Sequence, residues 1–258
     1  MKQPLTACII TLNEAERLSA CLASLEFVDE IVIVDSGSTD DTVALAESHG
    51  ARVIQQPWLG YGRQKQFAVD QASHDWVLCL DADERLTPEL ALEIQSAMQS
   101  PDADAYEMPR CNLFLGRWLR HGEGYPDLSL RLFHRQKARW SEDPVHEKVV
   151  CSGSVGRFKN DLNHQSADRI ERYLQKQNRY TSLQAEALHA RDKKPSAFRM
   201  LSSPVTRFFK FYIVRRGFLD GIPGLIHILI GCMNSFFKYA KLYELHASDA
   251  FKEQRRSE

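Results

Sequence analysis

The sequence lacks the features that mark several large classes of protein. Its formal net charge is only −1, with 33 Lys and Arg against 34 Asp and Glu, which argues against a general nucleic-acid-binding protein. The six cysteines, spread from Cys8 to Cys232, include no closely spaced pair, so neither a zinc site nor a disulfide framework is expected. Scattered cysteines of this kind are typical of reduced thiols, and we expect a cytosolic protein.

Long hydrophobic runs are also missing. The first residues, MKQPLTACIITLNE, reach polar side chains after only a few apolar ones, which predicts no signal peptide. The most apolar run, residues 222–237, is interrupted by His227 and Asn234 and is shorter than the roughly 20 residues that cross a bilayer. We therefore predict no membrane-spanning helix.

The chain nevertheless has enough hydrophobic material for a substantial core. Over 258 residues it is 43% hydrophobic and 26% charged, which predicts one large domain with or without an appendage. The charges are unevenly placed: up to Asp168 there are 16 Lys and Arg against 26 Asp and Glu, and beyond it 17 against 8. The front of the chain is acidic and the tail is basic.

Short apolar runs alternate with segments of helical period over the first hundred residues. The runs typical of strands buried on both faces are ACII (7–10), EIVIVD (30–35) and DWVLCLD (75–81). The helical segments that follow them are 11–25, 38–50 and 85–98. Asn13, with Glu16 three residues later, and Thr87, which precedes Pro88, are expected to cap two of these helices. The order predicts an α/β fold with a parallel sheet and right-handed crossovers.

Polar residues gather where each predicted strand ends. In parallel sheets ligands bind at the carboxyl ends of the strands, where loops meet helix N-termini. The residues expected at this rim are Thr11, Asn13, Glu14, Asp35, Ser38, Asp40, Asp81 and Asp83. Any one of these loops could be only a helix cap, because Ser, Thr, Asp and Asn favour that position, but three at one edge predict a binding site.

Asp81 and Asp83 predict a metal ion at this rim. Residues two apart in an extended segment point the same way, so both carboxylates reach toward one point. Without a partner each would raise the pKa of the other, and a divalent cation removes that cost. Mg²⁺ or Mn²⁺ takes one or two carboxylates and completes its shell with water and phosphate oxygens, which indicates a diphosphate ligand.

The segments IITLNE, VDSGSTDDT and LDADE, in this order and at these separations, resemble the donor-binding half of the inverting family 2 glycosyltransferases. The resemblance implies the GT-A fold: a Rossmann-like, mostly parallel sheet flanked by helices, here with a C-terminal helical extension. It implies that Asp35 contacts the uracil of a UDP-sugar and that Asp81 and Asp83 hold its ribose and metal-bound diphosphate. Other residues that it places at the donor are Thr11, Asn13, Glu14, Ser38 and Lys65. For Lys65, in GYGRQKQFA, a solvated helix face is the alternative.

The catalytic base should lie in WSEDPVHEKV, residues 140–149. Inverting transfer needs a group that takes the proton of the attacking acceptor hydroxyl. Related enzymes carry the base in a VHE block at this place, which implies Glu147, with Asp143 as the second candidate. A salt bridge between Glu147 and Lys148 at the rim is the alternative interpretation.

Two further assignments follow from the resemblance and from composition. His164 matches a histidine that related enzymes use as a metal ligand, beside Asp83; a surface or core histidine is the alternative. The segment GRWLRHGEGYPDLSLRLFHR is rich in Arg and aromatic residues, as expected where a sugar or phosphate is held. We assign it to acceptor recognition, with Asp127 and Arg131 as participants, although a basic, aromatic edge strand would have the same composition.

The tail predicts a separate function. We divide the chain into a GT-A domain at 1–165, with a donor half at 1–90 and an acceptor and base half at 91–165, and a helical, basic-aromatic extension at 166–258. In the extension an apolar wedge is expected beside cations that face anionic headgroups. The wedge residues are Phe208, Phe209, Phe211, Tyr212 and Phe218, and the cations are Arg207, Lys210, Arg215 and Arg216. A helical hairpin covering the sheet, or a dimer contact, is the alternative.

The expected function is a metal-dependent, inverting transfer of a hexose from a UDP-sugar to a lipid-linked acceptor. The DADE, LSLRLFHR, PVHEKV and GFLDGIPG blocks are similar to those of lipopolysaccharide core glucosyltransferases, which implies β-linked glucose, the inner-core heptose as acceptor, and a peripheral position on the cytoplasmic face of the inner membrane. No residue separates UDP-glucose from UDP-galactose or UDP-N-acetylglucosamine.

Three other functions remain open at this point. One is transfer to another cell-envelope polysaccharide, and another is a non-catalytic nucleotide-sugar-binding scaffold at the membrane. The third, a nucleotidyltransferase, usually has a glycine-rich basic loop after its first strand, and TLNEAER is not such a loop.

Overall fold

The computed structural model describes residues 2–142, 147–167 and 170–257, and the chain folds as two units. The first unit comprises Met1–Cys111 and Pro126–Gln165, and the second comprises Asn112–Tyr125 and Ser166–Glu258. Residues 112–125, which lie inside the sequence-based GT-A domain, are thus grouped with the C-terminal helices. Every residue proposed for catalysis or donor binding belongs to the first unit.

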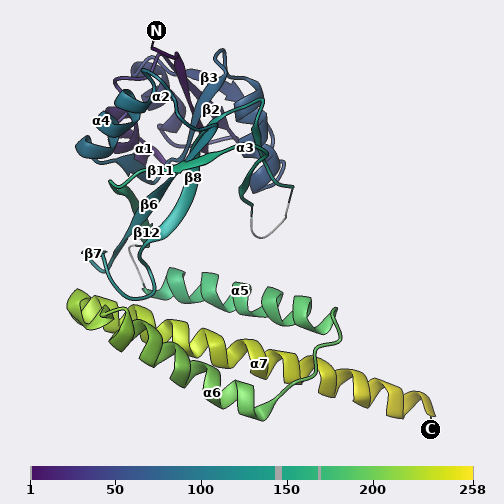
Figure 1. Cartoon of the computed structure of the whole chain (residues 1–258). Helices are drawn as coiled ribbons and strands as arrows, with labels where there is room; N and C mark the ends of the chain where they lie inside the picture. Colours follow the sequence, from purple (N-terminus) through teal and green to yellow (C-terminus); the bar gives the residue numbers. More distant parts are fainter. Residues whose placement is uncertain (1, 143–146, 168–169, 258) are drawn as a thin grey trace. The chain divides into compact units, whose positions relative to one another are not determined.

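Four parallel strands form one half of the sheet in the first unit (Figure 1). In spatial order they are β3 (Arg52–Gln55), β2 (Glu30–Asp35), β1 (Leu5–Thr11) and β4 (Trp76–Asp81). The helices that connect or follow them are α1 (Ala15–Ala23), α2 (Thr42–Ser48), α3 (Tyr61–Asp70) and α4 (Pro88–Ala97). The predicted α/β order is confirmed, with β3 and α3 as an additional strand and helix between the second and third predicted strands.

Beyond β4 the sheet becomes largely antiparallel. It continues through β8 (Asp127–His134), β6 (Ala105–Phe114), β12 (Leu162–Ala167) and β5 (Glu84–Leu86). Two short strands, β7 (Arg117–Leu119) and β11 (Val155–Arg157), also pair with β6, and a separate pair is formed by β9 (Ala138–Trp140) and β10 (Val149–Cys151). The antiparallel strands bring Glu84, Arg110, Arg131 and His164 close to the carboxyl end of β4.

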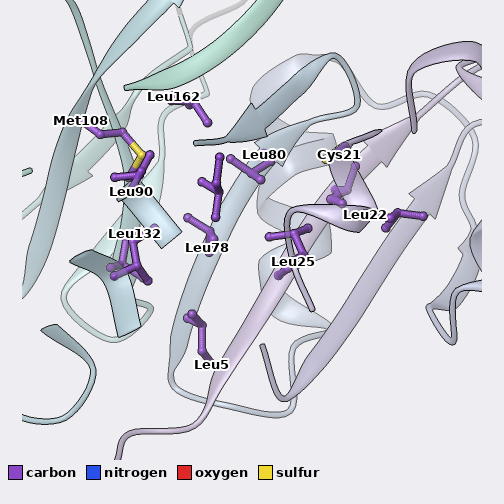
Figure 2. Packing of buried hydrophobic residues seen from close by; sticks show 14 of the residues in the cluster. Leu5, Cys21, Leu22, Leu25, Leu78, Leu80, Leu90, Met108, Leu132 and Leu162 are labelled. Carbon is purple, nitrogen blue, oxygen red and sulfur yellow. The ribbon is translucent and has the colours of Figure 1, made fainter. Parts of the chain in front are cut away.

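Successive strand residues point to opposite faces of the sheet, and each face is covered by a buried cluster of apolar side chains. Leu78 of β4 belongs to one buried cluster with Leu22 of α1, Leu25 just after it and Leu90 of α4 (Figure 2). Ile9 of β1 and Ala46 of α2 belong to the same cluster. The alternate residues of the strands, among them Cys8 and Cys79, pack with α3 on the other face. Burying each Leu or Ile stabilises the fold by about 1.5–3 kcal/mol relative to an exposed position.

One of the two predicted helix caps is confirmed and the other is wrong. Thr87 Oγ1 accepts a hydrogen bond from the Leu90 N–H at the start of α4. Asn13, with a φ of 55°, does not cap α1, which begins after Glu14 without a side-chain cap. The Asn13 side chain instead accepts a hydrogen bond of 2.8 Å from the Thr39 N–H, and so ties the first rim loop to the second.

The second unit is helical. Helices α5 (Ile170–His189), α6 (Ala197–Phe208) and α7 (Gly221–Ser257) lie side by side (Figure 1), and α6 leads through a π-helical turn (Phe209–Val214) and a 3₁₀ turn (Gly217–Asp220) into α7. Phe114, Leu119 and Ile230 form its small buried cluster.

One helical segment, Gly217–Asp249, is long and apolar enough to cross a membrane, which the apolar run 222–237 did not indicate. Of the 18-residue stretch that meets this criterion, 39% is buried within the protein, and core helices can have the same composition, so the expectation of no membrane-spanning helix stays a prediction. The sequence argument stopped at the polar residues His227 and Asn234. In the fold these are accommodated, because His227 lies 3.0 Å from the Tyr173 hydroxyl and Asn234 donates to the Gln177 side chain.

Candidate active site

The carboxylate of Asp35 is held at the end of β2 by four hydrogen bonds. Oδ2 accepts from the backbone N–H groups of Gly37 and Ser38, and Oδ1 accepts from the hydroxyls of Thr11 and Ser38 at 2.9 and 2.5 Å. Burial opposes ionisation, but the bonds from Ser38, Gly37 and Thr11 keep the pKa of Asp35 below its usual value. Asp35 is therefore a fixed hydrogen-bond acceptor at the rim.

The neighbouring loops hold Asn13 and Glu14 beside Asp35. The Asn13 N–H donates to Ser38 Oγ at 2.8 Å, and the Glu14 N–H donates to Thr42 Oγ1 at 2.8 Å. The Glu14 carboxylate pairs with Arg17 at 3.2 Å. Burial raises the pKa of Glu14. The structure thus brings together five of the residues predicted for the donor, namely Thr11, Asn13, Glu14, Asp35 and Ser38.

A row of seven side chains of alternating charge lies next to this rim, and we call it the charge row. In order of contact it consists of Glu147, Lys65, Asp81, Arg131, Glu84, Arg110 and Asp127. Its members come from α3, β4, β5, β6 and β8 and from the segment before β10. The row therefore exists only once the antiparallel half of the sheet has formed on β4.

Glu84, which lies between Arg131 and Arg110 in the charge row, has no solvent-exposed surface. Its Oε1 accepts from Arg131 at 2.7 Å and from Arg110 at 3.1 Å, and its Oε2 accepts from the Asp81 N–H at 3.1 Å. A buried carboxylate is costly unless it is paired and hydrogen-bonded, and here two guanidinium groups and one amide satisfy it. Glu84 thus fixes both arginines and the backbone of Asp81.

Asp81 is balanced by cations of the protein itself. Its Oδ1 lies 2.8 Å from Lys65 Nζ and its Oδ2 lies 3.0 Å from Arg131 Nη2. Burial opposes ionisation of Asp81, but the positive charges of Lys65 and Arg131 outweigh it and hold its pKa well below the usual range. The prediction that Asp81 needs a metal ion to stay ionised is therefore wrong, because Lys65 and Arg131 balance its charge.

Lys65 connects Asp81 with the predicted base. Its ammonium group lies 3.3 Å from Glu147 Oε1 and 4.7 Å from the centre of the Trp140 ring. Only 6% of Lys65 is exposed, which excludes the solvated helix face. The ion pair of Glu147 in the described part of the chain is with Lys65 rather than with Lys148. Asp143, the second candidate base, lies outside the described residues.

The other end of the charge row holds Asp127. Arg110 donates to Asp127 Oδ2 through Nε at 2.9 Å and through Nη2 at 2.5 Å. Arg131, predicted with Asp127 for the acceptor, is almost fully buried and is directed at Asp81 and Glu84, which raise its pKa against the effect of burial. Direct contact of Asp127 and Arg131 with an acceptor stays a prediction.

These residues surround a cavity of about 690 Å³ in the first unit. Its lining includes Lys65, Asp81, Arg110, Asp127, Arg131, Trp140 and Glu147. A cavity of this volume is within the range of small-molecule sites in proteins. The two carboxylates at the ends of the charge row, Glu147 and Asp127, both line it.

Asp83 and His164 form a second polar pair. His164 Nε2 lies 3.3 Å from Asp83 Oδ2, because His164 on β12 stands opposite Glu84 on β5. Among the residues that the structure describes, no three His, Cys, Asp or Glu side chains are grouped so as to hold a metal ion by themselves. A Mg²⁺ or Mn²⁺ ion that arrives with a diphosphate needs only one or two protein ligands, so this pair fits such an ion.

Comparison with known proteins gives the family. A model of the family described as "Glycosyl transferase family 2" matches residues 6–164. An uncharacterized glycosyltransferase of Rickettsia felis is 35% identical over 258 residues, which covers 94% of this chain and 90% of the relative. The chain belongs to glycosyltransferase family 2. The GT-A type α/β fold implied by the sequence resemblance is thereby confirmed.

One relative of this family 2 glycosyltransferase has a more specific name. The "Lipopolysaccharide core biosynthesis glycosyltransferase LpsC" of Rhizobium meliloti is 35% identical over 259 residues, which covers 96% of this chain and 95% of the relative. Among solved structures, S. aureus TarS 1–349 with UDP-GlcNAc has a TM-score of 0.49 at 13% identity and covers 95% of this chain and 92% of that chain. The family assignment rests on the sequence matches alone.

Three residues of the candidate site were missed by sequence reasoning. Glu84 stands within LDADE but was given no role, Arg110 lies between the buried residues Pro109 and Cys111 of strand β6, and Trp140 was not considered. A charged residue in the middle of a buried strand was the available signal for Arg110. No local pattern marks Trp140, whose position under Lys65 depends on the β9–β10 pair.

Proposed function

We propose that this family 2 glycosyltransferase moves a hexose, namely β-linked glucose, from UDP-glucose to a lipid-linked acceptor, the inner-core heptose of lipopolysaccharide. The observation that carries the proposal is the charge row, which joins the predicted donor residue Asp81 to the predicted base Glu147 through Lys65 along one cavity. The similarity to LpsC, whose name refers to lipopolysaccharide core biosynthesis, supports the acceptor.

In this proposal the rim binds the donor. Asp35, a fixed acceptor, takes a hydrogen bond from the uracil N–H, while Thr11 and Ser38 keep its orientation. Asp83 and His164 would hold Mg²⁺ or Mn²⁺, which when bound neutralises the diphosphate of the leaving UDP. Asp81, two residues before Asp83, would keep Lys65 and Arg131 in place at the donor.

Glu147 performs the proton transfer. The acceptor hydroxyl oxygen attacks the anomeric carbon from the side opposite UDP, the bond from that carbon to the diphosphate oxygen breaks, and the hydroxyl proton passes to the Glu147 carboxylate. UDP leaves with the bonding electron pair, and the configuration at the carbon is inverted. Lys65 positions Glu147 for this step and is a positioning residue.

Replacing Lys65 by Met is expected to lower kcat more than Lys65→Arg does. Methionine leaves the carboxylates of Asp81 and Glu147 without the cation between them, whereas arginine keeps that charge. Lys65→Arg should therefore keep most of the wild-type turnover. Equal losses in the two variants would show that the charge of Lys65 is not needed and would contradict the assignment. The measurement is the steady-state rate of UDP release.

The proposed function is tested by a donor panel. Purified protein is incubated with UDP-glucose, UDP-galactose or UDP-N-acetylglucosamine, with and without a heptose-containing lipid acceptor, and released UDP is measured. We expect acceptor-dependent release, fastest with UDP-glucose. Faster release with another UDP-sugar would overturn the proposed donor, and release that is unchanged by the heptose lipid would overturn the proposed acceptor.

A further inference from the structure

The helix α6 and the π-helical turn after it carry a row of exposed apolar side chains, which we call the α6 stripe. The stripe consists of Phe198, Leu201, Val205, Phe209 and Ile213. Each is between 50% and 79% exposed. They recur every three or four residues, which places them along one face of the helix. Helix α6 contributes no buried residue to the core, so the stripe has no structural partner within the described chain.

The opposite side of α6 is fixed to its own unit by polar contacts. Arg207 donates to Glu123, with 2.9 Å between Nε and Oε2, and to Ser235 Oγ on α7 at 3.1 Å. Gly231 leaves room for this contact, because a Cβ there would lie 2.4 Å from Glu123 Oε2. The helix is thus held through Arg207, and its apolar side is presented outward.

The segment that carries the stripe has charge of one sign. Residues 193–219 contain seven Lys and Arg and no Asp or Glu. Six of the seven are exposed, namely Lys193, Lys194, Arg199, Lys210, Arg215 and Arg216. The seventh, Arg207, is the residue paired with Glu123. An apolar helix face whose own segment carries cations and no acidic residue is complementary to a surface that offers both apolar chains and negative charge.

The long helix α7 is better explained as the core of this unit than as a membrane span. Lys241 Nζ donates to the Asn178 side chain and to the hydroxyls of Thr181 and Ser182 on α5, at 2.7–2.8 Å. Asn234 makes a further hydrogen bond to α5 through Gln177. These contacts would have to break if α7 were surrounded by lipid, and breaking them would leave polar groups unpaired in hydrocarbon.

We propose that the α6 stripe and its bordering cations dock the protein on an anionic lipid bilayer, with α6 lying in the plane of the interface on the cytoplasmic face of the inner membrane. Of the five aromatic residues expected from the sequence as the wedge, Phe209 and Phe218 are exposed, whereas Phe208, Phe211 and Tyr212 are partly buried against one another and against cations. Phe198, Leu201 and Val205 belong to the docking face in their place. Docking serves the proposed transfer to a lipid-linked acceptor but does not require it.

The test is co-sedimentation of the full-length protein with vesicles of phosphatidylcholine alone or mixed with phosphatidylglycerol. The wild type should sediment with the mixed vesicles, much less with phosphatidylcholine alone, and less as salt is added. The triple variant Phe198→Ser, Leu201→Ser, Val205→Ser and the double variant Arg199→Gln, Lys210→Gln should each lower binding at least about tenfold. Leu174→Ser, which alters an exposed leucine of α5, is the matched control and should bind like the wild type.

Circular dichroism and thermal unfolding of each variant separate lost docking from lost folding. Equal binding of wild type and triple variant, or sedimentation that salt does not weaken, would overturn the proposal. The proposal would also be overturned if the wild type formed a dimer and bound no vesicles while the triple variant was a monomer. That result would assign the stripe to contact with a second copy of the chain. UDP release without vesicle binding would contradict only this inference, and vesicle binding without UDP release would contradict only the proposed function.

Discussion

Replacing Glu147 by Gln is expected to lower kcat at least about 100-fold, with little change in the KM for the UDP-sugar. The amide keeps the size of the side chain and can still approach Lys65, but it cannot take the proton of the acceptor hydroxyl. The effect should therefore fall on the chemical step and not on donor binding. Steady-state measurement of UDP release with saturating acceptor tests this expectation.

Glu142→Gln is the matched control for that experiment. Glu142 lies five residues earlier in the same segment and is exposed, with ion pairs of 3.5 Å to Arg63 and 3.9 Å to Arg139 at the surface. Surface pairs of this kind contribute about 0–1 kcal/mol, so the variant should keep the wild-type turnover. Unchanged turnover in Glu147→Gln would refute Glu147 as the base and direct attention to Asp143.

Replacing Glu84 by Gln is expected to lower the free energy of unfolding by about 3–5 kcal/mol. The amide would leave Arg131 and Arg110 next to each other without the buried negative charge between them. Removing one partner from a buried ion pair has a cost of this size because the remaining charge stays buried. Urea denaturation, analysed with a common m-value, measures the difference.

The control for Glu84 is Glu107→Gln. Glu107 pairs with the exposed Arg157, so its replacement should change the free energy of unfolding by less than about 1 kcal/mol. In Glu84→Gln the catalytic rate should fall as well, since Arg131 would lose one of the two carboxylates that hold it. A Glu84→Gln protein as stable and as active as the wild type would show that the charge row needs no carboxylate between its two arginines.

The sequence predicts well those elements whose signal is local. Strands β1, β2 and β4 are continuous apolar runs that are buried on both faces, so their type and order could be read directly. Strand β3 was missed because RVIQ is an edge strand of four residues with no buried position, and its pattern alone is weak. The Asn13 cap was wrong because that residue adopts a left-handed backbone conformation and bonds to another loop.

In the candidate site, too, some residues are predictable from the local sequence and others are not. Asp35, Asp81 and Asp83 could be identified because each directly follows or ends an apolar strand. The charge row could not, because it depends on the pairing of β8 with β4 and β6, which brings Arg131 and Arg110 to Glu84 from distant positions. The burial of Lys65 is likewise a tertiary effect, since it requires Trp140 to lie beneath the ammonium group.

The polar residues of α7 show the same limitation. Read along the sequence, His227 and Asn234 interrupt an apolar run, which was the reason to expect no membrane-spanning helix there. In the fold each has a hydrogen-bonding partner on α5, so the helix continues to Ser257. A polar residue in an apolar helix thus predicts either a break or a neighbouring helix, and only the packing decides between them.

Binding of UDP measured by calorimetry, with and without Mn²⁺ or Mg²⁺, tests most directly the claim that this rim holds a metal-bound diphosphate. The account predicts that the wild type binds UDP much more tightly with the cation than without it, and that Asp83→Ala removes most of this difference while leaving weak metal-independent binding at Asp35. Equal UDP affinity with and without the cation in the wild type, or an unchanged cation dependence in Asp83→Ala, would contradict it.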